Sequence, residues 1–241
     1  MSQSKDQFKK EVFSSGEKSM PYRILYPVNF KKGNKYPVVF VLHGAGERGN
    51  DNELQLVHGS DLFLKNSATF PAIVVFPQCP LNNYWANVLK DIKNGEVTFN
   101  FQPAGEPTPP MQTLIKLINE ILNKEEVDKD RVYVGGLSMG AMGTFELLRR
   151  MPGTFAAAFA ICGGDNPENS IHYNKIPIRI FHGEKDDVVP VKFSVDIYNK
   201  LKDVNPEVSL TLYPEVKHDS WLNAFSEPDF LSWIFSKNKI K

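Results

Sequence analysis

A serine stands at the centre of Gly136-Leu137-Ser138-Met139-Gly140, a run of the form G-x-S-x-G. The apolar run Arg131-Val132-Tyr133-Val134 precedes it, and a helical pattern over residues 141–150 follows. A serine on a sharp turn between strand and helix takes a strained backbone conformation that exposes its hydroxyl, and only small neighbours fit beside it. We therefore predict that Ser138 is a nucleophile, with a plain tight turn as the alternative.

A serine hydroxyl needs a base to attack at neutral pH, and the base needs a carboxylate that holds its tautomer. Where the nucleophilic serine lies in this kind of turn, the three catalytic residues follow one another along the chain in the order serine, acid, histidine. Of the five histidines, only His218 comes late enough, just after the strand expected at residues 208–213. We predict that His218 is the base. His43 and His182 each end a strand as His-Gly, and we expect both to pack around the site.

Three acidic residues follow the strand expected at residues 178–181, namely Glu184, Asp186 and Asp187. Asp186 begins a D-x-x-V-P arrangement, and we predict that it is the carboxylate that supports His218. Glu184 and Asp187 remain alternatives. An acid here could also cap the following helix, a role that suits Asp187 better.

Acyl transfer also needs hydrogen-bond donors aimed at the developing oxyanion. The backbone N–H of Met139, directly after the nucleophile, is the first expected donor. The second should come from the loop His43-Gly44-Ala45-Gly46-Glu47-Arg48-Gly49, where Ala45 is favoured and Gly46 is the alternative. This loop lacks the Lys-Ser/Thr ending of a phosphate cradle, so phosphate binding is not expected.

Four further residues near these motifs have expected supporting roles. Trp85 could stack on a sugar or an aryl acyl group, or it could simply pack in the interior. Glu47 and Arg48 are expected to form an ion pair that stiffens the oxyanion loop, and contact with substrate is the alternative for both. Trp221, three residues after the base, is expected to pack against and position the His218 loop.

Short apolar runs alternate with helical patterns along the chain, without an internal repeat. Most of the runs are continuously apolar, as parallel strands buried on both faces are. Residues 9–26 have extended character and predict a leading antiparallel hairpin. The alternation predicts an α/β fold with a mostly parallel, doubly wound sheet, whose ligands bind at the carboxyl ends of the strands. Strands are expected at residues 38–42, 73–76, 132–134, 157–161, 178–181 and 208–213, and helices at residues 111–122, 138–150, 191–201 and within 219–236.

The chain has 241 residues, of which 41% are apolar, and this suits one α/β domain over residues 1–241. Its 28 basic and 28 acidic residues cancel, so neither nucleic acid nor an anionic membrane surface is an expected partner. No apolar run is long enough to cross a membrane. The polar N-terminus lacks the apolar core of a signal peptide, so we expect a soluble chain, either cytoplasmic or secreted with its signal removed. Oligomeric state stays open.

Cys79 and Cys162 each end an apolar run, and we expect two buried thiols. Two cysteines make neither a disulfide framework nor a zinc site. A disulfide between them is also not expected, because the strands that they end are not neighbours in the usual order of this kind of fold. The proline-rich run at residues 103–110 is expected to be loop, because proline cannot continue a helix.

The loop from His43 to Gly49 resembles the H-G-A-G-E-R-G loop of a set of α/β-hydrolases, often described as predicted peptidases or as polyhydroxybutyrate-depolymerase-like and feruloyl-esterase-like esterases. Four further motifs are similar to that group and carry the resemblance from about residue 40 to residue 221. They are Phe76-Pro77-Gln78-Cys79-Pro80 with Tyr84-Trp85, Gly136-Leu137-Ser138-Met139-Gly140, His182-Gly183-x-x-Asp186-x-x-Val189-Pro190 and His218-Asp219-Ser220-Trp221.

The resemblance implies a serine carboxylesterase with the α/β-hydrolase fold, the triad Ser138, Asp186 and His218, and no metal or organic cofactor. It implies short or aromatic acyl esters, acetyl or feruloyl, on carbohydrate as substrates. Residues 90–110 are expected to be a long loop that differs freely in such enzymes and shapes the substrate pocket. The alternatives are a serine peptidase of prolyl-oligopeptidase-like type, and a relative that binds carbohydrate without catalysis.

Overall fold

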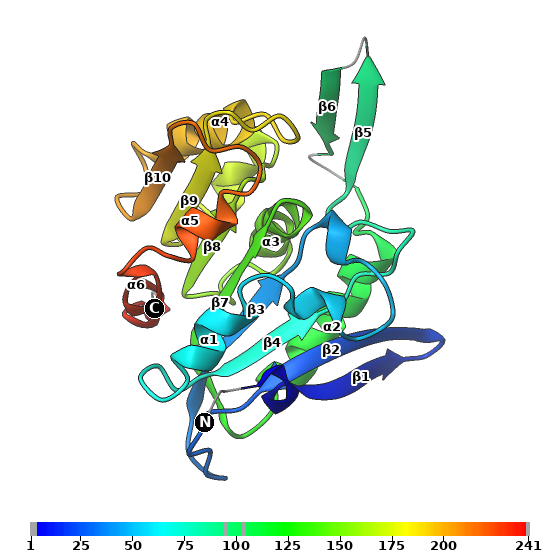
Figure 1. The fold of residues 1–241 in the computed structure, drawn as a ribbon, viewed down its shortest axis with the longest axis vertical. Helices are drawn as coiled ribbons and strands as arrows, with labels where there is room; N and C mark the ends of the chain where they lie inside the picture. Colours follow the sequence, from blue (N-terminus) through cyan, green and yellow to red (C-terminus); the bar gives the residue numbers. More distant parts are fainter. Residues whose placement is uncertain (1–3, 94–95, 103–104, 240–241) are drawn as a thin grey trace.

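The structure is a computed structural model. Its main sheet consists of β1 (Lys9–Ser15), β2 (Lys18–Leu25), β3 (Tyr36–Leu42), β4 (Ile73–Pro77), β7 (Val127–Leu137), β8 (Ala157–Ile161), β9 (Ile178–Gly183) and β10 (Val208–Tyr213). The described residues are 4–93, 96–102 and 105–239. The strands lie in the order β1-β2-β4-β3-β7-β8-β9-β10 (Figure 1). β1 and β2 form an antiparallel hairpin, β2 pairs antiparallel with β4, and the remaining pairs are parallel. The expected α/β fold and leading hairpin are confirmed.

Helices cover both faces of this sheet. They are α1 (Ser60–Lys65), α2 (Pro109–Leu122), α3 (Met139–Arg150), α4 (Lys192–Leu201), α5 (Trp221–Ala224) and α6 (Phe230–Phe235), with short 3-10 helices η1 (Lys5–Gln7), η2 (Ala45–Glu47), η3 (Leu54–Leu56) and η4 (Pro167–His172). Buried side chains of α2, α3 and α4 belong to one hydrophobic cluster, whereas those of α1, α5 and α6 belong to a second. The sheet therefore lies between two helical layers. None of the helices within the described ranges is long and apolar enough to span a bilayer.

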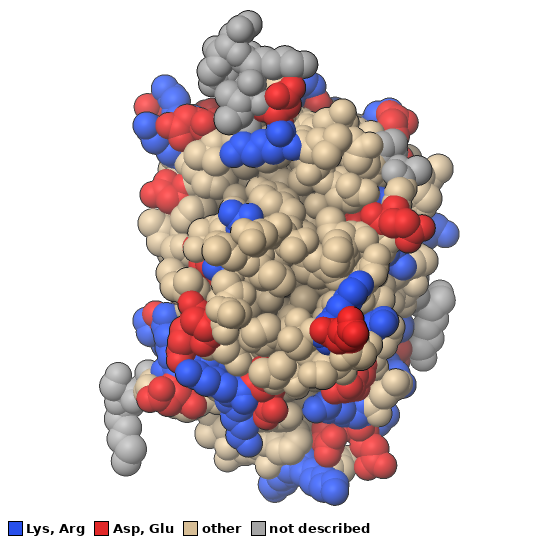
Figure 2. Space-filling model, turned by 90° about the vertical axis from the view of Figure 1, so that its right-hand side faces the viewer, with Lys and Arg blue, Asp and Glu red and all other residues tan. Residues whose placement is uncertain are grey.

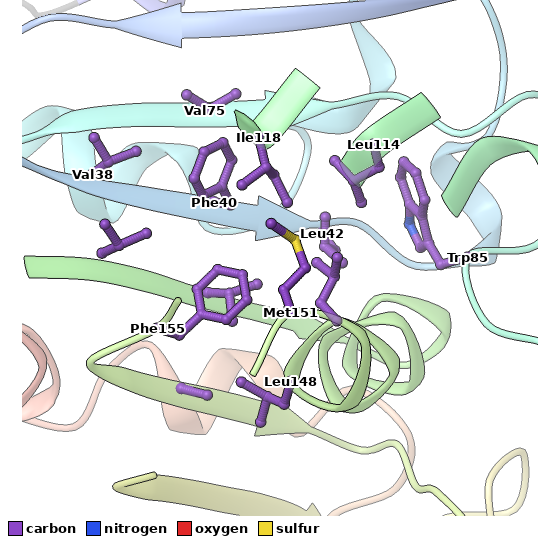
Figure 3. Close-up of a cluster of buried hydrophobic side chains, with 14 of the residues drawn as sticks. Val38, Phe40, Leu42, Val75, Trp85, Leu114, Ile118, Leu148, Met151 and Phe155 are labelled. Atoms are coloured by element: carbon purple, nitrogen blue, oxygen red, sulfur yellow. The ribbon is translucent and has the colours of Figure 1, made fainter. Parts of the chain in front are cut away.

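Strand β3 shows why continuously apolar runs build this sheet. All of its side chains are buried. Val38, Phe40 and Leu42 contribute to the cluster under α2 and α3, and Val39 and Val41 contribute to the cluster on the opposite face. Successive side chains of a strand point to opposite faces, so a strand covered on both sides needs apolar residues throughout. Figure 3 shows the first of these clusters, in which Val38, Phe40 and Leu42 lie along β3.

The segment at residues 90–110 differs from the expected long loop. Strands β5 (Val88–Lys93) and β6 (Glu96–Phe101) pair antiparallel in a separate two-stranded sheet. This arm projects beyond the main sheet at the top of Figure 1. In β6 the buried Phe99 and Phe101 alternate with the exposed Thr98 and Asn100, as in a strand with one covered face. The loop expectation was therefore wrong for most of this segment.

The proline-rich run is also only partly loop. Pro109 and Pro110 form the first turn of α2, and the Thr108 hydroxyl accepts a hydrogen bond from the N–H of Met111 as the N-cap. Proline is tolerated there because the first N–H groups of a helix have no intrahelical partner. Residues 103–104 of this run, and the first three residues of the polar N-terminus, lie outside the described residues.

Cys79 and Cys162 are free and buried, as expected. Charged side chains of both signs are mixed around the margins of the face in Figure 2, and a broad uncharged area lies between them. Neither sign forms a continuous patch across that face.

A close approach of α3 to β3 fixes the turn that carries Ser138. A Cβ atom added to Gly140 would lie 2.0 Å from the carbonyl oxygen of Leu42, and one added to Gly136 would lie 2.5 Å from the same oxygen. This oxygen belongs to the backbone, so it cannot move aside as the end of a flexible side chain can. The two glycines of the G-x-S-x-G run are therefore required by the contact between this helix and this strand.

We expect Gly140→Ala to lower the free energy of unfolding by at least about 2 kcal/mol, because the added methyl must push the helix away from β3. In an ordinary helix interior the same change stabilises by up to about 1 kcal/mol. Urea unfolding followed by circular dichroism measures the difference. Gly46→Ala is the matched control, since no described residue beyond its two chain neighbours and the backbone of its own helical turn lies within 4 Å of its added Cβ. A Gly140→Ala protein as stable as that control would contradict the close-approach explanation.

Candidate active site

Three residues from distant parts of the chain meet at the carboxyl ends of the central strands. Ser138 lies between β7 and α3, Asp186 follows β9, and His218 follows β10. Because β7, β8, β9 and β10 are successive parallel neighbours, their carboxyl ends lie at one edge of the sheet. This edge is where ligands bind in open α/β sheets.

The three side chains form a continuous hydrogen-bonded chain. Nε2 of His218 lies 2.9 Å from Oγ of Ser138, and Nδ1 of His218 lies 2.8 Å from Oδ2 of Asp186. Nδ1–H donates to the carboxylate, so Nε2 of the neutral ring accepts from the serine hydroxyl. This is the arrangement in which a histidine can take the serine proton during attack.

Ser138 has the strained backbone that its motif predicts. Its φ of 52° and ψ of −118° are unusual for a residue with a side chain. The strain is held by hydrogen bonds on both sides: its N–H donates to the carbonyl of Ile161 at 2.8 Å, and its carbonyl accepts from Ala141 and Met142. Its side chain is only slightly exposed, with the whole residue at 8%. The hydroxyl is therefore presented in one orientation.

Asp186 is held by four hydrogen-bond contacts. Its Oδ1 accepts from the N–H groups of Val188 and Val189, both at 2.9 Å. Its Oδ2 faces His218 and also His182, whose Nε2 lies 3.1 Å away. Burial alone would raise the pKa of this carboxyl, but the hydrogen bonds from His182, His218 and Val189 outweigh burial and lower the pKa well below its usual range. Asp186 therefore stays ionised at any pH where the protein would act.

The alternative acids do not reach the base. Asp187 is exposed and pairs with Nζ of Lys217 at 3.2 Å. Glu184 is also exposed, and its backbone N–H bonds to the carbonyl of Tyr213. Of the three acidic residues considered, the structure brings Asp186 to His218.

The two expected oxyanion donors both begin a helical turn beside Ser138. Met139 is the first residue of α3, and Ala45 is the first residue of η2. The first N–H groups of a helix lack intrahelical partners and carry the positive end of its dipole. Ala45 and Gly46 line the same cleft as Ser138 and His218. Backbone donors are thus available on two sides of the serine.

A cleft of about 310 Å³ opens over the triad. Residues from the oxyanion loop, the β5–β6 arm and the loops after β9 and β10 form its walls. The lining residues are Gly44, Ala45, Gly46, Glu47, Tyr84, Lys90, Phe99, Leu137, Ser138, Val188, Val189, His218 and Trp221. The volume lies at the lower end of the range of small-molecule sites.

Trp85 does not line this cleft. It has no exposed surface and packs in the cluster with Leu42 and Leu114 (Figure 3). Its Nε1–H donates to the carbonyl of His43 at 3.2 Å, and its ring meets the His43 ring edge-on at 5.4 Å. An aromatic ring buried below the oxyanion loop supports that loop from inside, so the structure corrects the expectation that Trp85 stacks on a substrate.

Glu47 and Arg48 do not form the expected ion pair in the described structure. The Arg48 guanidinium donates to the carbonyls of Ala45 and Asn83, and so it ties the oxyanion loop to the loop that carries Tyr84. Glu47 instead lies 3.6 Å from Nε2 of His58 and lines the cleft. The expected stiffening of the loop is present, but Arg48 provides it through backbone carbonyls.

The segment at residues 90–110 was expected to shape the substrate pocket, and its β5–β6 arm supplies Lys90 and Phe99 to the cleft, two residues that sequence reasoning did not name. His182 was expected only to pack nearby, whereas it contacts the Asp186 carboxylate directly. Trp221 meets the His218 ring edge-on at 5.6 Å, as expected for a residue that positions the base.

Within the described residues, one group of potential metal ligands overlaps the triad. Possible ligand atoms of Cys162, Asp186 and His218 lie within 4.8 Å of one another. Burial raises the pKa of the Cys162 thiol, which disfavours the thiolate that a metal would need. Asp186 and His218 already hold each other through a proton, so these residues fit a proton-transfer site better than a metal centre.

We expect Asp186→Asn to slow the covalent labelling of Ser138 by a fluorophosphonate about 10⁴-fold, because an amide beside Nδ1 favours the wrong imidazole tautomer. Asp187→Asn is the matched control, since it removes an adjacent carboxylate that is exposed and does not touch His218. Mass spectrometry of the labelled protein gives both rates. Equal labelling rates in these two variants would rule out Asp186 as the supporting acid.

Known proteins resemble this chain in sequence. The family model for phospholipase/carboxylesterase matches residues 27–229. The mouse (Mus musculus) lysophospholipase-like protein 1 is 24% identical over 215 residues, which cover 81% of this chain and 84% of that protein. An 83-residue stretch is 32% identical to the bifunctional acetylxylan esterase/xylanase XynS20E of Neocallimastix patriciarum, and it covers 34% of this chain and 12% of that protein.

Solved structures agree on the architecture. A thermostable esterase is 33% identical with a TM-score of 0.86; the match covers 97% of this chain, and this chain spans only 64% of that one. A ferulic acid esterase, 16% identical, has a TM-score of 0.68 with 95% and 97% of the two chains covered, and it supports the fold alone. Since the family model covers most of the sequence and the esterase superposes closely, the chain belongs to the phospholipase/carboxylesterase family of α/β-hydrolases.

Proposed function

We propose that this protein is a serine hydrolase of carboxylic esters that cleaves short or aromatic acyl groups from carbohydrate alcohols. The observation that carries the proposal is the hydrogen-bonded chain from Asp186 through His218 to Ser138, at the floor of an open cleft. Such a chain supplies an activated nucleophile, a general base and an electrostatic support in one place.

In the first half-reaction, Oγ of Ser138 attacks the carbonyl carbon of the ester. Nε2 of His218 takes the hydroxyl proton as the new C–O bond forms, and Asp186 stabilises the resulting imidazolium. The carbonyl oxygen becomes an oxyanion, which the N–H groups of Met139 and Ala45 stabilise. His218 then gives its proton to the alkoxide oxygen of the leaving alcohol as the original ester C–O bond breaks.

In the second half-reaction, water attacks the acyl-serine carbonyl. His218 takes a proton from the water, the oxyanion forms again at the same donors, and the bond between the acyl carbon and Oγ of Ser138 breaks. The proton returns to Oγ, and the carboxylic acid leaves. In both half-reactions the same three side chains provide the nucleophile, the base that moves each proton and the charge that stabilises the imidazolium. These residues therefore suffice for the whole cycle.

The walls of the cleft support the substrate class. Tyr84, Phe99 and Trp221 offer aromatic surface, and Glu47 and Lys90 offer charged hydrogen-bonding groups. Aromatic faces with polar groups at their edges suit sugar rings and aryl acyl groups. The partial likeness to a bifunctional acetylxylan esterase/xylanase also favours a carbohydrate ester.

We expect Ser138→Ala to lower kcat/KM for p-nitrophenyl acetate by at least about 10⁴-fold, because the nucleophile is gone while the fold is kept. Release of p-nitrophenolate measures the rate. Ser226→Ala is the control, since this serine is exposed and its hydroxyl donates to the carbonyl of Leu222 within its own turn. Equal hydrolysis by wild type and Ser138→Ala would show that another group is the nucleophile.

We expect kcat/KM for acetylated xylo-oligosaccharides and for methyl ferulate to exceed that for matched peptide p-nitroanilides by at least about 100-fold. Amide hydrolysis needs stronger protonation of its leaving group and closer positioning of the substrate. Product analysis by chromatography gives the rates. Faster cleavage of the anilides would replace the proposal with a serine peptidase, whereas tight saccharide binding without turnover would indicate a binding protein.

A further inference from the structure

A second histidine lies on the far side of the triad carboxylate. The His182 ring is completely buried at the end of β9. Its Nε2 is 3.1 Å from Oδ2 of Asp186 and 2.9 Å from the carbonyl oxygen of Val189. Its Nδ1 is 2.7 Å from Oγ of Ser194. Both ring nitrogens are therefore engaged, one with the triad and one with α4.

The chemistry of these partners determines where the His182 proton lies. A carboxylate oxygen and a carbonyl oxygen can only accept, so Nε2 must carry a hydrogen between them. Nδ1 then accepts from the hydroxyl of Ser194 when the ring is neutral. Oγ of Ser194 also lies 3.1 Å from the carbonyl of Gly163, so the hydroxyl has a second acceptor available if Nδ1 becomes protonated.

The same carboxylate oxygen thus faces two imidazoles: it is hydrogen-bonded to His218 and lies within reach of the His182 N–H, which the closer carbonyl of Val189 shares. His218 approaches Oδ2 of Asp186 at 2.8 Å and His182 approaches it at 3.1 Å, while Oδ1 is held by two backbone N–H groups. The buried Cys162 thiol also faces this cluster, within 4.8 Å of ligand atoms of Asp186 and His218, and Asp219 acts on that thiol electrostatically. A carboxylate held at both oxygens cannot rotate away from the base.

We propose that His182 is a positioning residue for the reaction: its Nε2–H fixes the Asp186 carboxylate so that Oδ2 stays aligned with Nδ1 of His218. The proposal rests on the proposed function, because alignment of the base matters only if Ser138 is the nucleophile. Loss of the His182 donor also makes the carboxylate more basic, and a more basic carboxylate holds a proton on His218 more strongly. The proposal therefore predicts a change in pH dependence as well as in rate.

The test compares His182→Leu, which removes the donor, with His182→Gln, whose amide can reach the position of Nε2 and donate to Asp186. We expect His182→Leu to lower kcat/KM for p-nitrophenyl acetate by about 10- to 100-fold. The acid limb of its pH profile should move to higher pH by roughly one unit. His182→Gln should recover most of the rate and the wild-type profile. Ser194→Ala removes the partner of Nδ1 and a contact with the carbonyl of Gly163 but keeps the Nε2–H of His182, so it should leave the profile in place.

Fluorophosphonate labelling of Ser138 is measured on the same variants, so that two failures can be told apart. A wild type that does not label at Ser138 overturns the proposed function. A wild type that labels, together with a folded His182→Leu variant that keeps the wild-type rate and pH profile, overturns only the role of His182. A His182→Gln variant as impaired as His182→Leu has the same meaning.

Because His182→Leu leaves buried polar groups without partners, it could fail to fold. The tautomer of His182 in the wild-type protein then decides the matter, through ¹⁵N–¹H spectra of histidine-labelled protein. A proton on Nε2 across the active pH range supports the proposal. A neutral ring with its proton on Nδ1 would overturn it, since Nε2 could then donate nothing to Asp186.

Discussion

The site depends on the close approach between the first turn of α3 and the end of β3. Gly140 leaves no room for a side chain beside the carbonyl of Leu42, and this contact bends the chain sharply at Ser138. The bend gives Ser138 its positive φ, points the hydroxyl out of the sheet and places the N–H of Met139 at the start of a helix. Nucleophile and first oxyanion donor are thus consequences of one packing constraint.

The part of the site around His218 depends on the Asp186 carboxylate, whose two oxygens both face hydrogen-bond donors. Asp186 takes hydrogen bonds from two backbone N–H groups and two imidazoles, and these outweigh its burial. Its loop therefore needs no metal or lysine to keep the charge in place. The base sits between this fixed charge and the fixed serine, with Trp221 against its ring. Each of the three side chains is restrained by neighbours that do not react.

The parts of this arrangement that the sequence predicts are those with a short-range cause. The bend at Ser138 follows from two glycines, and the strands follow from apolar runs that need burial on both faces. Two roles stayed open for Trp85, because the sequence places it in a loop near the site but does not tell which side of the loop its ring faces. The contact between His182 and Asp186 depends on a turn that folds the chain back over four residues, and spacing alone does not reveal it.

The β5–β6 arm is attached to the rest of the protein differently from the other walls of the cleft. Within the described residues it pairs with no strand of the main sheet, and a small third cluster around Phe99, Phe101 and Phe193 holds it in place. A two-stranded hairpin contributes little stability of its own, and the two larger clusters of the core contain none of its described residues. Mutations in the arm can accordingly accumulate without unfolding the catalytic centre. Substrate range can therefore diverge during evolution on this arm while the reaction chemistry is inherited unchanged.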